Sequence, residues 1–452
     1  MTPVNKVVIV GSGVSARSML QILASNHNAY DITVIRKNDH QLVPCAIPYI
    51  FHRLSPDKIT VGDNNWEGLG ARVLNDKAVD IHRANRQLIL ESGREVPYDR
   101  LVIATGADPV QPPIPGIELG NVHYVDKDLQ NLRSLYEKAQ DARHVVMIGG
   151  GFIGVEFADE LANMEVPPRV SLVESESRLI PKAFDPEFSQ VIEETLVEKG
   201  VRVYTDTMVK ALQGDTQVTG VSLSDGNEVE ADMVICCIGV APNSDFAKQS
   251  GLEVHDKDGG IITDEYYYTT DPNIMACGDC ITKGDFFDGK GIAGVRLAST
   301  AAMEGKIAGF NIERKTVPNN QGVMNFFSTK IGDQAFGASG MTETEAIQKD
   351  YDVMALSGKF PNRHPVQFDD VTDNYVKLIF DRQDGRILGG EVRGDEAVGE
   401  MVNAIGMAVK QKMTAYTLMS NQYATHPLLT TGPSGYPLLK LSVEACMRLM
   451  GR

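Results

Sequence analysis

The stretch KVVIVGSGVSA, residues 6–16, joins an apolar run of β-branched residues to a glycine-rich turn. Its Gly11, Gly13 and Ala16 follow the spacing Gly-x-Gly-x-x-Ala, and an apolar pattern with helical period continues to Leu23. Glycine permits the tight turn and lets the backbone approach a pyrophosphate, which then lies at the helix N-terminus. A second strand over 31–35 comes at the spacing of a βαβ unit. The sequence therefore predicts a dinucleotide-binding α/β unit at the start of the chain.

The same arrangement recurs in the middle of the chain. Residues 144–156, HVVMIGGGFIGVE, repeat the strand and the glycine turn, and a strand over 169–173 is followed by Glu174. A longer repeat supports the pairing, because glycine, glutamate, valine, aspartate and a final glycine hold identical offsets in 93–106 and 226–239. Each copy predicts a hairpin turn followed by a buried strand that ends beside a nucleotide. We therefore expect two Rossmann-like α/β domains, one inserted into the other.

The last third of the chain differs in character and contains no nucleotide-binding fingerprint. Residues 375–389 predict a hairpin around a turn, and apolar residues at helical spacing predict helices over 396–409 and 438–449. This α+β region is expected to support the rest of the fold or to mediate association between subunits. The predicted organisation is 1–115 and 246–322 for the first dinucleotide-binding domain, 116–245 for the second, and 323–452 for the C-terminal domain.

Charge and cysteine usage limit the class of partner. Lys plus Arg is 43 and Asp plus Glu is 60, so the net charge is −17. That surface repels nucleic-acid phosphates and anionic lipid, and no apolar run approaches the ~18 residues of a membrane helix. The N-terminus enters a strand directly, so no signal peptide is expected. Six cysteines in 452 residues do not form a disulfide scaffold, which favours a reducing cytoplasm.

These motifs, together with Ala104-Thr105-Gly106 and the Gly278-Asp279 that closes a short strand, resemble the pyridine nucleotide-disulfide oxidoreductases. Within that family the chain is similar to the single-cysteine branch, which contains coenzyme A-disulfide reductases, NADH oxidases and peroxidases, and persulfide or polysulfide reductases. The resemblance covers nearly the whole chain. It implies an FAD-dependent NAD(P)H oxidoreductase that forms a homodimer through its C-terminal domain and requires no metal.

The resemblance also implies which residues bind each cofactor. Asp279 is expected to bind the ribityl and phosphate region of FAD, and a helix over 291–309 is expected to pack against the flavin. The predicted FAD-binding residues are Gly11, Gly13, Ser15, Ala16, Arg36, Lys37, Pro44, Val79, Ala104, Thr105, Gly106, Gly278, Asp279, Leu297 and Ala298. The predicted NADH-binding residues are Gly149, Gly151, Phe152, Ile153, Gly154, Glu156, Glu174 and Gly239.

The two predicted nucleotide sites differ after their second strand. The family usually places an acidic residue there on the FAD adenosine ribose, but this chain has Arg36 and Lys37, and arginine cannot accept a hydrogen bond. Either the backbone and stacking on Arg36 hold the adenosine, or FAD is bound more weakly. At the other site Glu174 would accept from a 2′-hydroxyl and repel a 2′-phosphate. NADH is therefore preferred to NADPH; Glu176 strengthens and Arg178 opposes that preference.

Cys45 is the candidate redox residue, in the pattern Cys-x-x-Pro-Tyr over 45–49. The family's redox cysteine occurs at this place beside the flavin, and Pro48 is typical of a first helical turn, whose N-terminus would stabilise a thiolate. Two-cysteine relatives carry a partner five residues later, where this chain has Ile50. The sulfur must therefore pair with coenzyme A, a small thiol, a persulfide sulfur or oxygen. Cys277 and Cys280 are interpreted as packing residues rather than metal ligands.

His426 and Tyr423 are the candidate proton donors. Two-cysteine reductases have a His-Pro here that reaches the partner subunit's cysteine, oriented by a carboxylate five residues later, where this chain has Thr431. Coenzyme A-disulfide reductases use tyrosines of this region instead, which makes Tyr423 and Tyr436 rivals. A structural His-Pro turn is the other alternative.

The predicted activity is reduction of a disulfide, persulfide or polysulfide by NADH through FAD and Cys45. Coenzyme A disulfide is one candidate substrate. The peroxidase and oxidase branch has a histidine in the first glycine turn, where this chain reads Val14-Ser15-Ala16, so peroxide chemistry is disfavoured. Two alternatives stay open: an NADH oxidase that reduces oxygen, and a slow flavoprotein that acts as a redox sensor or electron-transfer partner.

Overall fold

The computed structural model describes residues 5–25, 30–289, 291–364 and 369–451. The chain divides into two compact units. The first contains Met1–Pro113, Val122–Ala142 and Ile238–Val323, and the second contains Ile114–Asn121, Arg143–Cys237 and Met324–Arg452. The four predicted domain segments divide the chain differently, and their boundaries stay predictions.

The first unit is built on a parallel five-stranded sheet with the order β20-β9-β1-β2-β5. Val7 to Val10 are at most 5% exposed, as expected for a strand that is covered on both faces. The strands are β1 (Lys6–Val10), β2 (Asp31–Arg36), β5 (Ala71–Asn75), β9 (Arg100–Ile103) and β20 (Ile274–Ala276).

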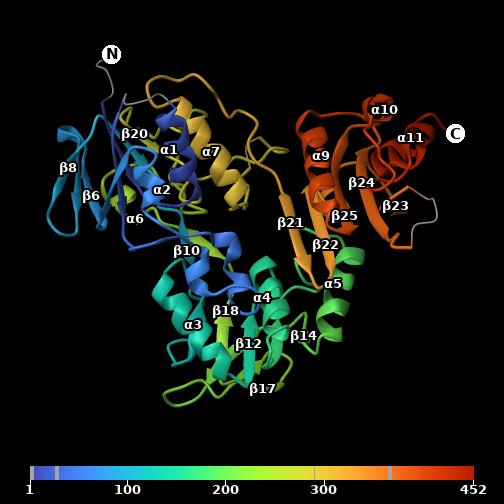
Figure 1. The fold of residues 1–452 in the computed structure, drawn as a ribbon, viewed down its shortest axis with the longest axis horizontal. Coiled ribbons are helices and arrows are strands. Elements are labelled where there is room, and N and C mark those ends of the chain that lie inside the picture. The colour runs from blue at the N-terminus through green and yellow to red at the C-terminus, as the bar shows by residue number, and fades with distance from the viewer. Residues whose placement is uncertain (1–4, 26–29, 290, 365–368, 452) are drawn as a thin grey trace. The chain divides into compact units, whose positions relative to one another are not determined.

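Two helices of the first unit, α1 (Val14–Ala24) and α7 (Ala298–Phe310), pack side by side (Figure 1). The contact is close because α7 presents glycine at Gly305 and Gly309. A Cβ on Gly305 would lie 2.1 Å from the Ser15 carbonyl oxygen, and one on Gly309 would lie 2.9 Å from Ile22 Cβ. The helices α1 and α7, which lie some 280 residues apart in the sequence, thus form one layer of the first unit.

The predicted helix over 291–309 is wrong in its first part, since α7 begins at Ala298. The residues before it turn back on the preceding loop instead. Ala293 N–H donates to the Lys283 carbonyl at 2.9 Å, and the Gly291 carbonyl accepts from Asp285 at 3.0 Å.

Smaller elements complete the first unit. An antiparallel three-stranded sheet has the order β6-β7-β8, and β3 pairs with β4 and β10 with β19. Their bounds are β3 (Gln41–Leu42), β4 (Thr60–Val61), β6 (Ala78–His82), β7 (Gln87–Leu90), β8 (Glu95–Pro97), β10 (Ala107–Pro109), β11 (Val122–Tyr124), β19 (Val240–Pro242), α2 (Asn64–Glu67), α3 (Leu129–Asp141) and α6 (Asp245–Gln249). Short 3₁₀ helices are η1 (Pro44–Ala46), η2 (Pro48–Ile50), η3 (Pro56–Ile59) and η4 (Arg83–Asn85).

The second unit repeats the parallel arrangement, with neighbouring strands in the order β18-β12-β13-β14. The strands are β12 (His144–Ile148), β13 (Arg169–Val173), β14 (Arg202–Tyr204) and β18 (Met233–Cys236), with helices α4 (Phe152–Ala162) and α5 (Pro186–Glu198). The antiparallel strands β15 (Val209–Gln213), β16 (Gly220–Leu223) and β17 (Glu228–Glu230) precede β18, as the 93–106 and 226–239 repeat predicts. Gly93 and Gly226 both have left-handed φ, +82° and +88°, at the hairpin turns.

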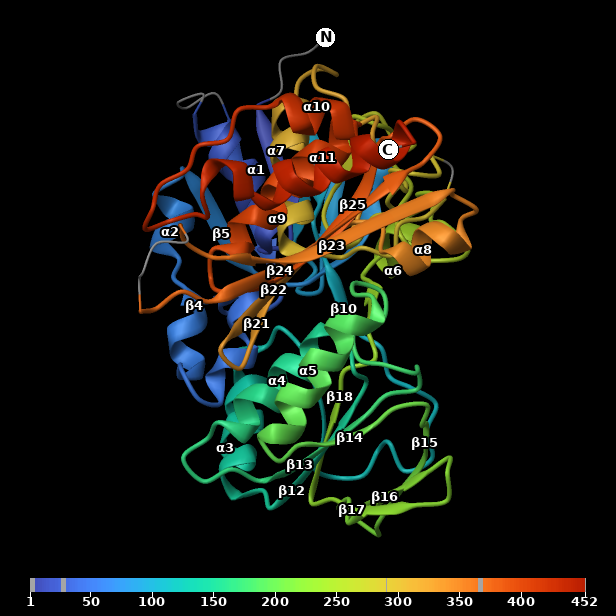
Figure 2. The same ribbon diagram turned by 90° about the vertical axis from the view of Figure 1, so that its right-hand side faces the viewer.

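The C-terminal part of the second unit is an antiparallel five-stranded sheet with the order β21-β22-β25-β24-β23 (Figure 2). Helix α9 contacts β22 and β25, and α11 contacts β23 and β24. The bounds are β21 (Phe326–Ile331), β22 (Gln334–Gly340), β23 (Val353–Pro361), β24 (Asp373–Asp381), β25 (Ile387–Gly394), α8 (Glu343–Gln348), α9 (Val398–Lys410), α10 (Ala415–Ser420), η5 (Pro433–Gly435) and α11 (Pro437–Leu449). The predicted hairpin and both predicted helices are confirmed, as is the α/β fold class.

Candidate cofactor and redox site

The first glycine turn has the geometry that a pyrophosphate site requires. Gly11 has φ +111°, and a Cβ there would lie 2.1 Å from the Ala104 carbonyl oxygen, so no other residue fits. Gly13 is the N-cap of α1, without a side-chain cap and without an acidic residue in the first turn. The first N–H groups of the helix are therefore available to an anion.

A cavity of about 500 Å³ opens at this turn, within the first unit. Nine of the predicted FAD-binding residues line it: Gly11, Gly13, Arg36, Lys37, Pro44, Val79, Ala104, Thr105 and Gly106. Sequence reasoning missed Asn38, His40, Lys127, Asn243 and Phe246, which also line it. Asn243 comes from a distant segment and exchanges hydrogen bonds with Thr105, whose Oγ1 donates to the Asn243 carbonyl at 2.6 Å. No motif marks this asparagine, so only the fold could reveal it.

Arg36 is buried and already has protein partners. Its Nε donates to Asn75 Oδ1 at 2.7 Å, and its Nη1 and Nη2 lie 2.7 Å and 3.0 Å from the two carboxylate oxygens of Asp63. The guanidinium therefore has a fixed place at the end of β2. Lys37 forms an exposed ion pair with Asp108 at 3.1 Å. The acidic group near this strand end is therefore the Asp63 carboxylate, which forms an ion pair with Arg36.

The loop after β20 contains a buried acceptor that lacks a partner. Asp279 Oδ1 is buried and makes no hydrogen bond with any described residue. A buried carboxylate oxygen without a donor is costly, so this atom fits a ligand hydroxyl. Gly278, with φ +85°, lies against Ser15, and Leu297 and Ala298 form the start of α7. Together with the cavity, this orphaned acceptor fits FAD.

The second glycine turn has the same backbone geometry. Gly149 has φ +107°, and a Cβ on Gly154 would lie 1.9 Å from the Gly149 carbonyl oxygen. Gly151 is the N-cap of α4 and again has no side-chain cap. The second strand, β13, is followed by Glu174, whose Oε2 accepts from Gly150 N–H at 2.6 Å and whose Oε1 accepts from Glu176 N–H at 2.8 Å. Arg178 donates to backbone carbonyls of Pro181 and Phe184 at 3.4 Å.

Three other residues predicted to bind NADH have neighbours inside the protein. Glu156 is partly buried and its Oε1 accepts from Thr329 Oγ1 at 2.6 Å; loss of solvation raises the pKa of its carboxyl to about 7. The ring of Phe152 packs against Phe327 with a centroid distance of 4.8 Å. Gly239 has φ +119° in the segment after β18 and belongs to the first unit. A contact of these residues, or of Ile153, with NADH stays a prediction.

Cys45 is the one exposed cysteine of the six, all of which lie among the described residues. Pro48 does lie in a first helical turn, as expected, since it begins the 3₁₀ helix η2, but this helix has three residues and Cys45 lies inside the preceding 3₁₀ helix η1. An α-helix from Pro44 would need the N–H of residue 48, and Pro48 has none. Pro44, next to Cys45, lines the cavity.

The remaining cysteines lie in less reactive surroundings. Burial raises the pKa of the Cys236 thiol to about 12 and raises those of Cys237, Cys277 and Cys280 as well. A thiol with a raised pKa is a poor nucleophile, so these cysteines behave as packing residues.

The C-terminal candidates lie in the second unit. His426 is exposed, and its Nδ1 accepts from Leu428 N–H at 3.2 Å, which leaves the proton of the neutral ring on Nε2. Thr431 is buried, while Thr430 Oγ1 accepts from His426 N–H at 3.0 Å. Tyr423 donates its hydroxyl to the Leu418 carbonyl at 2.9 Å and stacks on Tyr436 with a centroid distance of 4.6 Å. Burial raises the pKa of both tyrosines.

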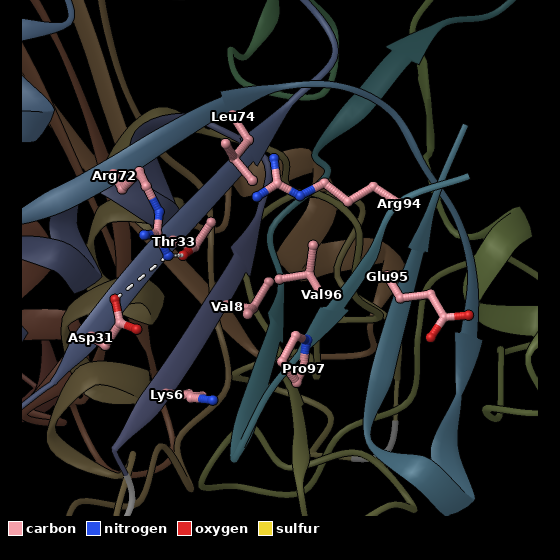
Figure 3. Close-up of a pocket in the computed structure, with 10 residues that line it drawn as sticks. All are labelled: Lys6, Val8, Asp31, Thr33, Arg72, Leu74, Arg94, Glu95, Val96 and Pro97. Atoms are coloured by element: carbon pink, nitrogen blue, oxygen red, sulfur yellow. Dashed lines mark hydrogen bonds and ion pairs between the residues drawn. The ribbon is translucent and has the colours of Figure 1, made fainter. Parts of the chain in front are cut away.

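A second, smaller pocket of about 130 Å³ lies between the parallel sheet and β8 (Figure 3). Alternate residues of β1, β2 and β5 form one wall, where Arg72 lies 3.7 Å from Asp31 and donates to Thr33 Oγ1 at 3.0 Å. Lys6 begins β1, whereas Gly11 follows its end. This pocket is therefore not part of the cofactor cavity.

Comparison with known proteins assigns a family to this geometry. The family model described as pyridine nucleotide-disulphide oxidoreductase matches residues 5–287, and its dimerisation domain matches residues 327–433. The NADH oxidase of Enterococcus faecalis is 29% identical over 438 residues, 93% of this chain and 95% of that protein. The NAD(P)H coenzyme A polysulfide/persulfide reductase of Pyrococcus horikoshii is 30% identical over 417 residues, 89% of this chain and 90% of that protein.

Solved structures show the same architecture. An NAD-dependent persulfide reductase from A. fulgidus has a TM-score of 0.90 and 26% identity, covering 99% of this chain and 84% of that chain. A water-forming NADH oxidase from Lactobacillus brevis, bound to NADH, has a TM-score of 0.89 and 25% identity, covering 99% of both chains. Among the described residues, no helix is long and apolar enough to cross a membrane.

Proposed function

The chain belongs to the pyridine nucleotide-disulphide oxidoreductase family as an FAD-dependent NAD(P)H oxidoreductase, and from this premise we propose that it reduces a disulfide, persulfide or polysulfide with NADH. When bound, FAD supplies the two-electron carrier between NADH and the acceptor. The residues that would hold FAD are those of the cavity and the Asp279 loop.

The observation that carries the proposal is the position of Cys45. It is the exposed cysteine among six, and its neighbour Pro44 forms part of the cavity wall. A sulfur acceptor therefore has access to the thiol from solvent, next to a residue of the cavity wall. The persulfide reductase of Pyrococcus horikoshii, at 30% identity, supports sulfur chemistry.

The proposed acceptor step balances as a two-electron reduction. The Cys45 thiolate attacks one sulfur of a disulfide or polysulfide, forms a mixed disulfide and releases the other sulfur as a thiolate. Two electrons, supplied by NADH, then cleave the mixed disulfide into the Cys45 thiolate and a second thiolate. The released sulfurs take up protons. Coenzyme A disulfide, polysulfide and other small disulfides all fit this chemistry.

His426 is the better candidate for the proton donor. Its Nδ1 is occupied by Leu428 N–H, so its exposed Nε2 carries a proton that it can give to a leaving thiolate. The Tyr423 hydroxyl already donates to the Leu418 carbonyl, and burial raises its pKa. In the proposed homodimer, His426 acts on Cys45 of the partner subunit. Exposed apolar side chains of the C-terminal region support such an interface: Met407, Leu428 and Leu429.

The preference for NADH over NADPH is also a proposal. The Glu174 carboxylate closes the second turn by accepting from Gly150 N–H, and a 2′-phosphate beside it would meet repulsion from Glu174 and Glu176. Arg178, the nearby cation of this segment, donates to backbone carbonyls. It is therefore less available to a 2′-phosphate.

The test is an anaerobic titration of the purified flavoprotein with NADH, followed by separate additions of coenzyme A disulfide, polysulfide and air. We expect a sulfur acceptor to reoxidise the flavin rapidly, and Cys45→Ser to abolish that reaction while NADH still reduces the flavin. Cys446→Ser, which changes a buried cysteine, is the matched control and keeps the activity. Unchanged turnover in Cys45→Ser would refute the proposal.

NADH oxidase activity is the second candidate, because the NADH oxidase of Enterococcus faecalis is 29% identical over 93% of this chain. Oxygen would then reoxidise the flavin without a sulfur acceptor. Reoxidation by air alone, with equal rates in wild type and Cys45→Ser, identifies this activity.

A further inference from the structure

A buried ion pair in the first unit has a position that stability alone does not explain. The side chain of Lys283 is 2% exposed and that of Glu304 is 1% exposed. Lys283 Nζ donates to both carboxylate oxygens of Glu304 at 2.7 Å. Burying two charges costs solvation free energy, and apolar side chains of similar volume often stabilise a fold as well or better. The function of this pair is therefore found in what else it contacts.

The pair holds one residue, Gly278, through both polar groups of its backbone. Gly278 N–H donates to Glu304 Oε2 at 2.9 Å, and Lys283 Nζ donates to the Gly278 carbonyl at 2.8 Å. Gly278 has the left-handed φ of +85°, and a Cβ there would lie 2.5 Å from Ser15 Oγ. Two charged side chains thus fix a backbone conformation that glycine alone can adopt.

The next residue is Asp279, whose Oδ1 is buried without a hydrogen-bond partner among the described residues. On its other side, the Asp279 carbonyl accepts from Arg296 Nε at 3.3 Å, and Arg296 Nη2 lies 3.3 Å from Asp258. The backbone around this carboxylate is therefore held at both ends. The unpaired Asp279 Oδ1 is therefore held in a fixed position, where it can accept a hydrogen bond from a ligand hydroxyl.

We propose that Lys283 and Glu304 are positioning residues for FAD that act through Gly278 and Asp279. The proposal rests on FAD as the ligand of Asp279 and does not depend on which acceptor the enzyme reduces. Loosening the pair lets the Gly278 peptide move, so the Asp279 carboxylate loses its fixed position and FAD binds less tightly.

The charges around the pair agree with this role. Burial raises the pKa of the Glu304 carboxyl, Lys283 and Gly278 N–H oppose that effect, and Asp279 adds to it. The Lys283 ammonium thus compensates two carboxylates that lie close together.

The experiment measures the dissociation constant of FAD for the full chain, by flavin fluorescence after removal and re-addition of FAD. We expect Lys283→Met/Glu304→Met to raise it about ten- to one-hundredfold, the usual effect of losing the residues that orient a direct ligand contact. Lys283→Gln/Glu304→Gln keeps a donor and an acceptor for Gly278, so its value is expected closer to wild type. A folded methionine pair with wild-type FAD affinity overturns the proposal.

A double-mutant cycle with Asp279→Asn separates positioning from general loss of stability. If the pair acts through Asp279, replacing it in the Asp279→Asn background raises the dissociation constant much less than in wild type. An equal fold-increase of the FAD dissociation constant in the wild-type and Asp279→Asn backgrounds would contradict an effect through Asp279. Lys199→Met is the matched control, because it breaks an ion pair with the buried Asp159 in the second unit. The control is expected to keep wild-type FAD affinity, and a loss as large as that of the methionine pair refutes the specific role.

Discussion

The two glycine turns share a backbone but differ in what surrounds them. Gly11 and Gly149 have φ of +111° and +107°, and their N-caps, Gly13 and Gly151, have nearly identical dihedral angles. The second strands, however, end differently. One ends at Arg36, which is held by Asp63 and Asn75, and the other is followed by Glu174, which accepts from its own glycine turn. Backbone geometry therefore supports the proposed pyrophosphate site at each turn, while the side chains at the end of the second strand distinguish the two proposed ribose sites.

The largest effects are expected from the glycines, because a side chain there meets backbone. Gly11→Ala places a Cβ 2.1 Å from the Ala104 carbonyl, and Gly154→Ala places one 1.9 Å from the Gly149 carbonyl. Gly11→Ala should yield protein without bound flavin, whereas Gly154→Ala should keep the yellow colour and lose reduction by NADH. Absorbance at flavin wavelengths and anaerobic NADH titration measure both. Loss of flavin in both variants would contradict separate sites.

The second-largest effect concerns stability and pH at Glu156, whose counterpart in the first turn is the uncharged Ser18. Burial raises the pKa of Glu156 to about 7, so the folded chain prefers the protonated acid and loses stability as pH rises from the unfolded pKa toward 7. Glu156→Gln removes this titration. Between pH 5 and 8, the free energy of unfolding of the wild type should fall by about 2–3 kcal/mol more than that of Glu156→Gln. Urea unfolding of both proteins at both pH values tests this prediction. An equal loss of stability in the wild type and in Glu156→Gln would contradict it.

Glu174 should affect NADH affinity by a smaller amount. Glu174→Ala removes the acceptor for Gly150 N–H and for a ribose hydroxyl, so the KM for NADH should rise about tenfold or more. The discrimination against NADPH should fall at the same time. Ratios of kcat/KM for the two nucleotides measure this effect, and an unchanged ratio would show that Glu174 is not the discriminating group.

The smallest effect on cofactor affinity is expected at Arg36. Since Asp63 and Asn75 already occupy its guanidinium, Arg36→Met should lower stability by about 1–3 kcal/mol but change FAD affinity less than Glu174→Ala changes that for NADH. Melting temperature and FAD titration separate these outcomes. A loss of FAD affinity larger than the loss of stability would mean that Arg36 binds the adenosine directly.

Local patterns were enough to predict the two turns and their strands. The turns and their strands depend on residues within about 30 positions of one another, so spacing and periodicity describe them, whereas the cavity residues from Gly11 to Gly106 followed from the family resemblance. Asp63 and Asn243 lie outside any motif, and Lys283 and Glu304 are separated by 21 residues across a loop. Such contacts form only when the chain folds, because no period or motif relates the partners. The 3₁₀ turn that contains Cys45 was missed for another reason: Pro48 does begin a helical turn, but its missing N–H also prevents a continuous α-helix from Pro44.

The packing of α1 on α7 has a consequence for biosynthesis. The first unit needs β20 and α7, which are made after the whole of 143–237, to complete its sheet and its helical layer. A ribosome must therefore synthesise about two thirds of the chain before Asp279 and Gly305 emerge. Until then, the nascent chain holds an unfinished sheet with an exposed edge at β9, which is a hazard for aggregation. Capture of flavin is consequently a late event during translation, and fragments that end before Gly309 should not retain the cofactor.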